Sequence, residues 1–262
     1  MNLTLVIPAA GRGSRLERSN SRMPKGMIAL QGKPILEFAL MTGLQSPVDK
    51  IVFVISKDGD AIPEYFGTTY EGIPVSYVMQ PEPRGLAHAV SMAERHVSDF
   101  MLVINGDEIY LDTSHSEMCN YVSEKGADGL VGFLHTPQSY HIRRGYGLLL
   151  DPYGRVLKLV EKPSKAWNNL LGVGTWIVPA EFFEFFRRTP INVMRGERDF
   201  VEVVQLMVAE GRSIYGFDLK GEFVNINTSA DLVHAEVLLT AHLKASHGLL
   251  TASKSEHSRA YS

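Results

Sequence analysis

The sequence predicts an α/β protein in which a mostly parallel sheet is covered by helices on both sides. Short apolar runs alternate with amphipathic stretches between residues 3 and 105, which is the pattern of consecutive β–α units. The apolar runs have the length and composition of buried strands. A turn signal in the middle of the chain indicates a hairpin, so antiparallel strands are expected beside the parallel ones.

The first half of the chain holds four strand candidates and three helix candidates. The strands are expected over Leu3–Ala9, Lys50–Ser56, Val75–Gln80 and Phe100–Asn105. Pro34 suits the first turn of a helix, and apolar residues follow it at helical spacing. A second helix is predicted over Gly85–Val97, and Asp112 or Thr113 is expected to cap a third.

The second half begins with the hairpin. Leu148–Leu150 and Val156–Val160 flank an Asp-Pro-Tyr-Gly stretch that fits a type I turn. Further strands are expected over Val173–Val178, Ser213–Asp218 and Phe223–Ile226, and helices over Ala180–Phe186, Phe200–Ala209 and Ala230–Leu243. Thr228 or Ser229 is expected to cap the last helix. Residues 1–245 are expected to form one domain and residues 246–262 a flexible tail.

Composition excludes several classes of protein. Of the 262 residues, 45% are apolar and 21% are charged, which is typical of a globular domain. A net charge of −3 gives no electrostatic footprint for nucleic acid or for an anionic membrane. Cys119 is the only cysteine, so neither an internal disulfide nor a cysteine-based metal site is expected. Without the pattern of a signal peptide, a cytoplasmic location is expected, and the sequence leaves a homo-oligomer open.

The stretch from Leu5 to Leu16 carries the first functional signal. An apolar run breaks into the small residues of the sequence AAGRGSRL, which contains Gly11, Gly13 and Arg15. Glycines after a strand let backbone N–H groups approach an anion, and a guanidinium suits phosphate oxygens. Lys25 follows as a second cation. The alternative is an ordinary glycine turn, because neither a G-K-[ST] ending nor a third fingerprint glycine is present.

Two further signals follow predicted strands. Gln80 ends one strand, and Gly85 opens the next helix after two prolines, so an amide able to read a base edge would face a helix start. Asp107 follows another strand after a glycine, where an acid can bind magnesium at the carboxyl edge of the sheet. The alternatives are a proline-rich loop with an exposed glutamine and a solvated strand end.

The later signals are weaker when taken singly. Glu161 and Lys162 end the hairpin, where they could contact a hydroxyl and a phosphate or form a charged strand end. Gly147 would allow a ligand to approach the hairpin backbone. Arg143 and Arg144 indicate a solvated loop. Asn225 ends a late strand, where it could serve a site or only the geometry of a turn. Zinc-protease and serine-hydrolase motifs are absent.

Taken in order, these stretches resemble those of the sugar-1-phosphate nucleotidylyltransferases, the family of glucose-1-phosphate thymidylyl- and uridylyltransferases. The resemblance covers nearly the whole chain in the order and spacing of the family. It is carried by AAGRGSRL with a downstream PK, QPEPRGLAHAV, INGDEIY, YGLLLDPYGRVLKLVEKP, GVGTWIV and VNINTSADL. The glycine–arginine signature with its PK is specific, and the later motifs are convincing as a series.

The resemblance implies a Rossmann-like fold with a mixed sheet and a Mg²⁺-dependent reaction. An NMP group would pass from an NTP, UTP or dTTP, to a sugar 1-phosphate, giving an NDP-sugar and pyrophosphate. It implies nucleotide binding by Ala10, Gly11, Gly13, Gln80 and Gly85, and catalysis by Arg15, Lys25 and Asp107. It also implies acceptor binding by Gly147, Glu161 and Lys162, and metal binding by Asp107 and Asn225.

One departure from the family pattern concerns the metal. Asn225 stands where the family usually has an aspartate, so an acid is missing there. Two other functions remain alternatives. One is a cytidylyltransferase that acts on a small phosphorylated alcohol or phosphonate, such as phosphocholine. The other is a non-catalytic module that binds a nucleotide for regulation.

Overall fold

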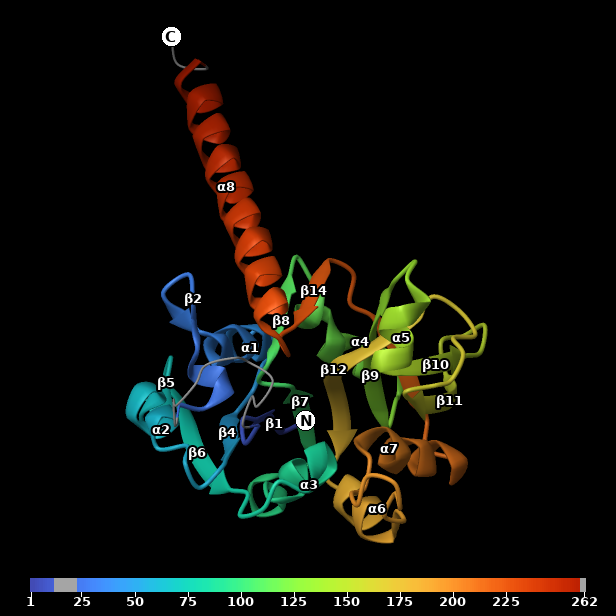
Figure 1. The fold of residues 1–262 in the computed structure, drawn as a ribbon. Coiled ribbons are helices and arrows are strands. Elements are labelled where there is room, and N and C mark those ends of the chain that lie inside the picture. The colour runs from blue at the N-terminus through green and yellow to red at the C-terminus, as the bar shows by residue number, and fades with distance from the viewer. Residues whose placement is uncertain (12–22, 260–262) are drawn as a thin grey trace.

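The computed structural model describes residues 1–11 and 23–259, and for residues 246–259 it describes the backbone alone. The described part of the chain is built around a ten-stranded mixed sheet (Figure 1). Its main path has the order β11-β10-β12-β7-β1-β4-β6-β5, and β9 pairs with both β12 and β13. The strands are β1 (Leu3–Pro8), β4 (Lys50–Ile55), β5 (Thr69–Tyr70), β6 (Ile73–Met79), β7 (Phe100–Ile104), β9 (Gly129–His135), β10 (Tyr146–Leu150), β11 (Val156–Glu161), β12 (Leu170–Pro179) and β13 (Ile214–Asp218).

The expected α/β architecture is confirmed. Strand β1 pairs in parallel with β4 and β7, and β4 pairs in parallel with β6. Strand β12 runs antiparallel to β7, and the hairpin β10–β11 joins the sheet beside it. Two small sheets complete the strands: β2 (Ala29–Leu30) with β3 (Lys33–Pro34), and β8 (Glu108–Leu111) with β14 (Glu222–Asn225).

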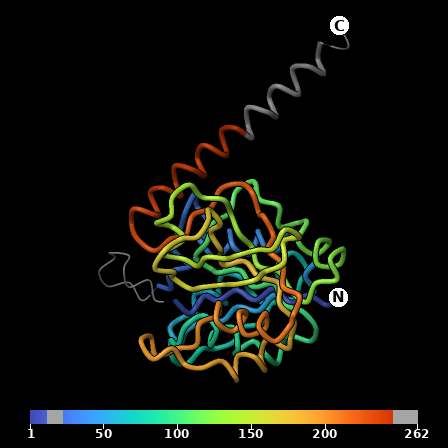
Figure 2. The backbone as a smooth tube through the Cα atoms, turned by 90° about the vertical axis from the view of Figure 1, so that its right-hand side faces the viewer, coloured from blue at the N-terminus to red at the C-terminus, as the bar shows by residue number. Residues whose placement is uncertain are grey.

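Helices cover both faces of the sheet, and Figure 2 shows α6 and α7 on the opposite side from the start of α8. Alternate residues of β1 pack on opposite faces: Leu5 and Ile7 join α1, α2 and α4, whereas Val6 joins α3, α6 and α7. Burial on both faces explains why this run is continuously apolar. The helices are α1 (Ile35–Gly43), α2 (Ala61–Phe66), α3 (Gly85–Ser91), α4 (Met118–Lys125), α5 (Ser139–Arg144), α6 (Phe182–Arg188), α7 (Phe200–Ala209) and α8 (Ser229–Arg259).

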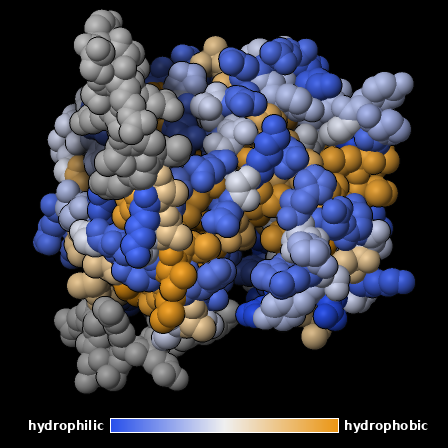
Figure 3. All heavy atoms as spheres, turned by 90° about the horizontal axis from the view of Figure 1, so that it is seen from above, coloured by the Kyte–Doolittle hydropathy of each residue, from blue (hydrophilic) through white to orange (hydrophobic). Residues whose placement is uncertain are grey.

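Helix α8 begins as the sequence predicts. The Asp231 N–H donates to Thr228 Oγ1 at 3.3 Å, and the Thr228 N–H donates to Asp231 Oδ2 at 2.7 Å, which is a reciprocal capping arrangement. The helix projects away from the sheet, from an end of the molecule where polar and apolar residues are interspersed (Figures 1 and 3). It continues past Leu243 to Arg259, over residues for which a tail was expected. The flexibility of that tail stays a prediction.

Other local predictions were wrong. The residue before α4 is Glu117, which makes no side-chain capping bond, so neither Asp112 nor Thr113 caps this helix. Asp112 has a φ of 55° where β8 ends, and its carboxylate lies 3.2 Å from His242 of α8. Pro34 precedes α1 rather than occupying its first turn. Helix α3 ends at Ser91, and a separate 3-10 turn follows it.

No helix within the described residues is long and apolar enough to cross a membrane.

Candidate functional site

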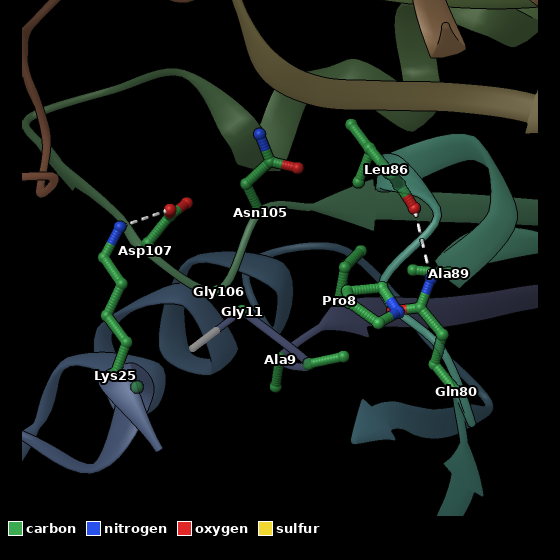
Figure 4. A pocket seen from close by; sticks show the side chains of 14 residues that line it. Pro8, Ala9, Gly11, Lys25, Gln80, Leu86, Ala89, Asn105, Gly106 and Asp107 are labelled. Atoms are coloured by element: carbon green, nitrogen blue, oxygen red, sulfur yellow. Dashed lines mark hydrogen bonds and ion pairs between the residues drawn. The ribbon is translucent and has the colours of Figure 1, made fainter. Parts of the chain in front are cut away.

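A cavity of about 300 Å³ opens where β1, β6 and β7 end (Figure 4). The first turn of α3 and a 3-10 turn at Lys25–Met27 complete its walls. Of the residues expected to bind the nucleotide or to act on it, this cavity is lined by Ala10, Gly11, Lys25, Gln80, Gly85 and Asp107. Gly13 and Arg15 lie outside the described residues. The carboxyl ends of parallel strands thus bring together signals that lie far apart in the sequence.

Lys25 and Asp107 form an ion pair on the wall of this cavity, with 2.7 Å between Nζ and Oδ2. The Lys25 side chain is 9% exposed and that of Asp107 is 34% exposed, so the carboxylate remains accessible to a ligand while the ammonium is largely shielded. Lys25 Nζ also donates to Asn227 Oδ1 at 3.3 Å. A Cβ at Gly106 would lie 2.8 Å from the Pro8 carbonyl oxygen, so glycine is needed for the chain to approach β1 before Asp107.

The amide of Gln80 is held in one orientation at the end of β6. Its Nε2 donates to the Gly85 carbonyl oxygen at 3.2 Å and lies 2.9 Å from His88 Nδ1. Burial and the nearby Arg84 guanidinium lower the pKa of His88, which favours a neutral ring that accepts at Nδ1. Both Nε2 hydrogens are then used, and Gln80 Oε1 is the amide atom left to meet a ligand.

A second cavity, of about 640 Å³, adjoins the first. Leu86 and Asn105 line both cavities and form their shared wall. Arg143 and Arg144 line the second cavity from α5, so the loop expected for them is a helix, although both residues are exposed as expected. The loop before α7 contributes Glu197.

Glu161 and Lys162 line the second cavity at the end of β11, as the hairpin signal predicts. Lys162 Nζ and Arg195 Nη1 lie 3.3 Å and 3.4 Å from Glu161 Oε1. Burial raises the pKa of Glu161, and the two cations partly offset that rise. Gly147 is not a lining residue, although its neighbour Tyr146 is one. A Cβ at Gly147 would lie 3.3 Å from Ile142, so the close approach there is to a side chain.

Asn225 lies beside a buried carboxylate. Its Nδ2 donates to Glu108 Oε1 at 3.3 Å, and its Oδ1 accepts from Asn227 Nδ2 at 2.6 Å. Glu108 is 2% exposed, and burial together with the Asp107 carboxylate raises its pKa to about 8, although its hydrogen-bond donors oppose the rise. The chain of contacts therefore runs from Asp107 through Lys25 and the two asparagines to Glu108.

The donor atoms near Asp107 fit a magnesium ion that arrives with a phosphate ligand. The Ile226 N–H donates to the Asp107 carbonyl oxygen at 2.9 Å, so the end of β14 lies beside this residue. The contacts of Lys25 bring the amides of Asn227 and Asn225 near this carboxylate, whereas the neighbouring Glu108 is buried. No three His, Cys, Asp or Glu side chains gather as metal ligands within the described residues. Magnesium commonly takes one or two carboxylates and completes its shell with substrate phosphates and water.

Several lining or neighbouring residues were missed from the sequence, and three of them make contacts that matter to the site. Asn227 contacts Lys25, Arg195 contacts Glu161, and Asn105 joins the two cavities. Asn227 and Asn105 each lie within two residues of a predicted site residue, so a wider reading of those motifs could have found them. Arg195 has no comparable signal, because its partner is contributed by a strand far away in sequence.

Among known proteins, the chain is similar to two uridylyltransferases and to a bifunctional protein. The chain is 31% identical over 234 residues to the UTP–glucose-1-phosphate uridylyltransferase AglF of Haloferax volcanii, covering 88% of this chain and 94% of that protein. It is 25% identical to a UTP–glucose-1-phosphate uridylyltransferase of Bacillus subtilis, covering 83% and 84% of the two chains. It also matches the bifunctional protein GlmU of Methanococcus vannielii at 29% identity, but spans only 53% of that protein's length.

Solved structures establish the likeness of fold. A UDP-glucose pyrophosphorylase complexed with UDP-glucose superposes with a TM-score of 0.81 at 19% identity, covering 92% of this chain and 99% of the other. A UTP-bound UGPase from Acinetobacter baumannii gives a TM-score of 0.80 at 20% identity, with 95% and 99% coverage. The family model described as nucleotidyl transferase matches residues 4–242, which is most of the chain. The chain therefore belongs to the nucleotidyl transferase family.

Proposed function

We propose that this enzyme transfers the NMP group of UTP or dTTP to a sugar 1-phosphate, giving an NDP-sugar and pyrophosphate. The observation that carries the proposal is the pair of adjoining cavities, which share Asn105 and Leu86. One cavity contains the Lys25–Asp107 pair and the other contains Glu161 and Lys162. Two substrates in these cavities would meet at the shared wall, as a direct transfer requires.

The chemistry needs no covalent nucleophile from the protein. A phosphate oxygen of the acceptor attacks the α-phosphorus, and the bond to the pyrophosphate oxygen breaks as the new phosphorus–oxygen bond forms. In this proposal the Gly11 backbone and Lys25 bind the triphosphate, together with Gly13 and Arg15. Lys162 binds the acceptor phosphate. Positioning and charge stabilisation supply the acceleration.

Magnesium bound at Asp107 would neutralise charge on the triphosphate and on the departing pyrophosphate. Asn225 is the proposed second protein ligand, and Asn227 offers a further amide oxygen next to it. Lys25 holds the Asp107 carboxylate in place through their ion pair, with 2.7 Å between Nζ and Oδ2. Since the protein contributes one carboxylate, metal affinity is expected to depend on the nucleotide.

The orientation of Gln80 supports a base that carries a hydrogen at N3. Its Nε2 is engaged by Gly85 and His88, so Oε1 is offered to the base as an acceptor. Uracil and thymine donate from N3–H, whereas N3 of cytosine is itself an acceptor and would face Oε1 without a hydrogen between them. An unmade hydrogen bond in a buried site costs more than the bond contributes when it is made.

Pyrophosphate release, measured over a matrix of NTPs and phosphorylated acceptors with magnesium, tests the proposed function. Release is expected only when a sugar 1-phosphate is present, with UTP or dTTP preferred over CTP by about tenfold or more. A preference for CTP with phosphocholine would establish the cytidylyltransferase alternative instead. Nucleotide binding without turnover of any pair would establish the regulatory alternative.

Lys162→Ala is expected to raise the KM for the acceptor by about tenfold or more, because a charge-assisted contact to its phosphate is lost. The KM for the NTP should not change. Lys125→Ala is a matched control, because Lys125 lies against Tyr121 and Tyr215 and lines neither cavity. Initial rates over a grid of both substrates separate the constants. A rise confined to the KM for the NTP would move Lys162 to the nucleotide side of the site.

A further inference from the structure

Five acidic side chains among the described residues line the second cavity, and only one of them lacks a partner. The four that accept hydrogen bonds or form ion pairs are Glu108, Glu161, Asp199 and Asp231. The fifth is Glu197, which is half-buried. Its carboxylate has neither a hydrogen-bond donor nor a cation as a partner within the described part of the chain. The cavity wall thus includes a carboxylate that is available to a ligand.

Glu197 lies against the first turn of α3, close to the boundary between the two cavities. A Cβ on Gly85 would lie 2.6 Å from Glu197 Cδ and closer still to Oε2, so the carboxylate occupies the space beside this glycine. Gly85 lines the first cavity, and the next residue, Leu86, lines both. Glu197 itself lines only the second of these two cavities. The carboxylate is therefore in contact with α3 and accessible from the second cavity.

A tight turn before α7 holds Glu197 in this place. The Asn192 N–H donates to the Glu197 carbonyl oxygen at 2.8 Å, and the Gly196 N–H donates to the Asn192 carbonyl oxygen at 2.7 Å. Gly196 has a φ of 69°, a left-handed conformation that glycine adopts readily. Arg195 Nη1 lies 3.4 Å from Glu161 Oε1, which ties the same turn to β11. Because the turn is fastened on both sides of Glu197, a ligand would meet the carboxylate already in position.

The charge of Glu197 indicates which part of a substrate it meets. Both substrates of the proposed reaction carry phosphates, and a carboxylate that no cation neutralises would repel them. The uncharged part of the acceptor is its sugar, and each sugar hydroxyl can donate a hydrogen bond. A carboxylate accepts such bonds, and hydrogen bonds to a charged acceptor are stronger than those between neutral groups. A hydroxyl of the acceptor sugar is therefore the group that fits this side chain.

We propose that Glu197 is a specificity-determining residue whose carboxylate accepts a hydrogen bond from one hydroxyl of the acceptor sugar. This inference rests on the proposed function. Two parts of the acceptor are then recognised separately, since Lys162 binds the phosphate and Glu197 selects the sugar by the position of a hydroxyl. A sugar 1-phosphate that lacks this hydroxyl leaves the carboxylate without a donor in the occupied cavity, and is therefore a poorer substrate.

Removal of single hydroxyls from the acceptor tests the assignment. Pyrophosphate release is measured with saturating UTP or dTTP, whichever is turned over faster, and with glucose 1-phosphate or its 2-, 3-, 4- and 6-deoxy analogues. For one of these analogues, the wild-type protein is expected to lose about tenfold or more in kcat/KM, because a hydrogen bond to a charged group is lost. The affected position identifies the hydroxyl that Glu197 contacts.

Glu197→Ala removes the carboxylate, so the affected analogue and glucose 1-phosphate should differ by no more than about twofold. Glu197→Gln keeps an oxygen that can accept a hydrogen bond but loses the charge, and should retain a difference of about threefold. Glu184→Ala is the matched control, because Glu184 is exposed on α6 and lines neither cavity, and it should keep the tenfold difference. The loss of a negative charge affects the phosphate of every analogue equally, so the ratio between analogues reports the hydroxyl contact.

Equal kcat/KM of the wild-type protein for all the deoxy analogues would overturn the assignment, as would a tenfold difference that survives in Glu197→Ala. If Glu197→Ala does not fold, the reduced difference expected for Glu197→Gln decides the same question. The ribose is the other sugar near this boundary, so a ratio of UTP to 2′- or 3′-deoxy-UTP that depends on Glu197 would also contradict the assignment to the acceptor. Failure of the wild-type protein to turn over glucose 1-phosphate with either nucleotide would instead count against the proposed function, and the inference would fall with it.

Discussion

Asp107→Ala is expected to reduce nucleotidyl transfer by at least about a hundredfold, the loss that follows when one charge-stabilising group is removed from an active site. Asp107 is the one carboxylate among the described lining residues of the nucleotide cavity, and it is the partner of the shielded Lys25 ammonium. Its removal takes away the main proposed metal ligand and frees Lys25 to reorient. Both changes weaken the stabilisation of charge on the triphosphate.

Pyrophosphate release measures this effect, and circular dichroism verifies the fold of the variant. Glu82→Ala is the matched control, because Glu82 pairs with Arg84 on the exposed surface of the nearby loop and lines neither cavity. Near-normal activity of Asp107→Ala would show that the metal and the triphosphate are bound elsewhere.

Calorimetry of magnesium binding adds a readout that does not depend on catalysis. With a single carboxylate, the wild-type protein should bind magnesium weakly alone and tightly when UTP is present. Asn225→Asp should retain activity and tighten magnesium binding, because it places a second carboxylate beside Asp107. Tight magnesium binding to the free wild-type protein would contradict a site that is completed by nucleotide oxygens.

Patterns within short stretches allowed much of the fold to be predicted. The strand candidates around β1, β4, β6 and β7 and the hairpin β10–β11 were confirmed, because burial on both faces or a turn signal leaves a local mark on the sequence. Strand β9 was missed. Its Gly129 and Gly132 resemble strand breakers, yet a Cβ on Gly132 would lie 3.0 Å from the Thr175 carbonyl oxygen. Only the neighbouring strand reveals that these glycines permit close packing.

The site was predictable residue by residue but not as a set of contacts. Lys25 and Asp107 were each singled out by a local motif, but their ion pair joins positions 82 residues apart. The orientations of the Gln80 and Asn105 amides depend on His88 and Glu108, whose roles follow from burial and hydrogen bonding. Neither the burial nor the hydrogen bonding of these side chains can be predicted from the sequence before the topology is known. Placement of Arg15 and Gly13 in the site stays a prediction.

The largest expected effect on stability belongs to Trp176, at the centre of β12. Its side chain is 1% exposed, stacks on Tyr146 with 4.8 Å between ring centroids, and contacts Phe200 at 4.9 Å. Trp176→Ala is expected to lower the free energy of unfolding by about 3–5 kcal/mol, because it removes this burial and leaves a cavity that packed strands on both sides cannot fill.

Two further variants separate the causes of that loss in urea unfolding followed by circular dichroism. Trp167→Ala changes the other tryptophan, which is 46% exposed, and should cost less than about 1 kcal/mol. Trp176→Phe should cost clearly less than Trp176→Ala. A phenyl ring retains much of the stacking on Tyr146, and Trp176 Nε1 has no hydrogen-bond partner among the described residues to lose. Equal losses for Trp176→Ala and Trp167→Ala would mean that β12 is not the centre of the core.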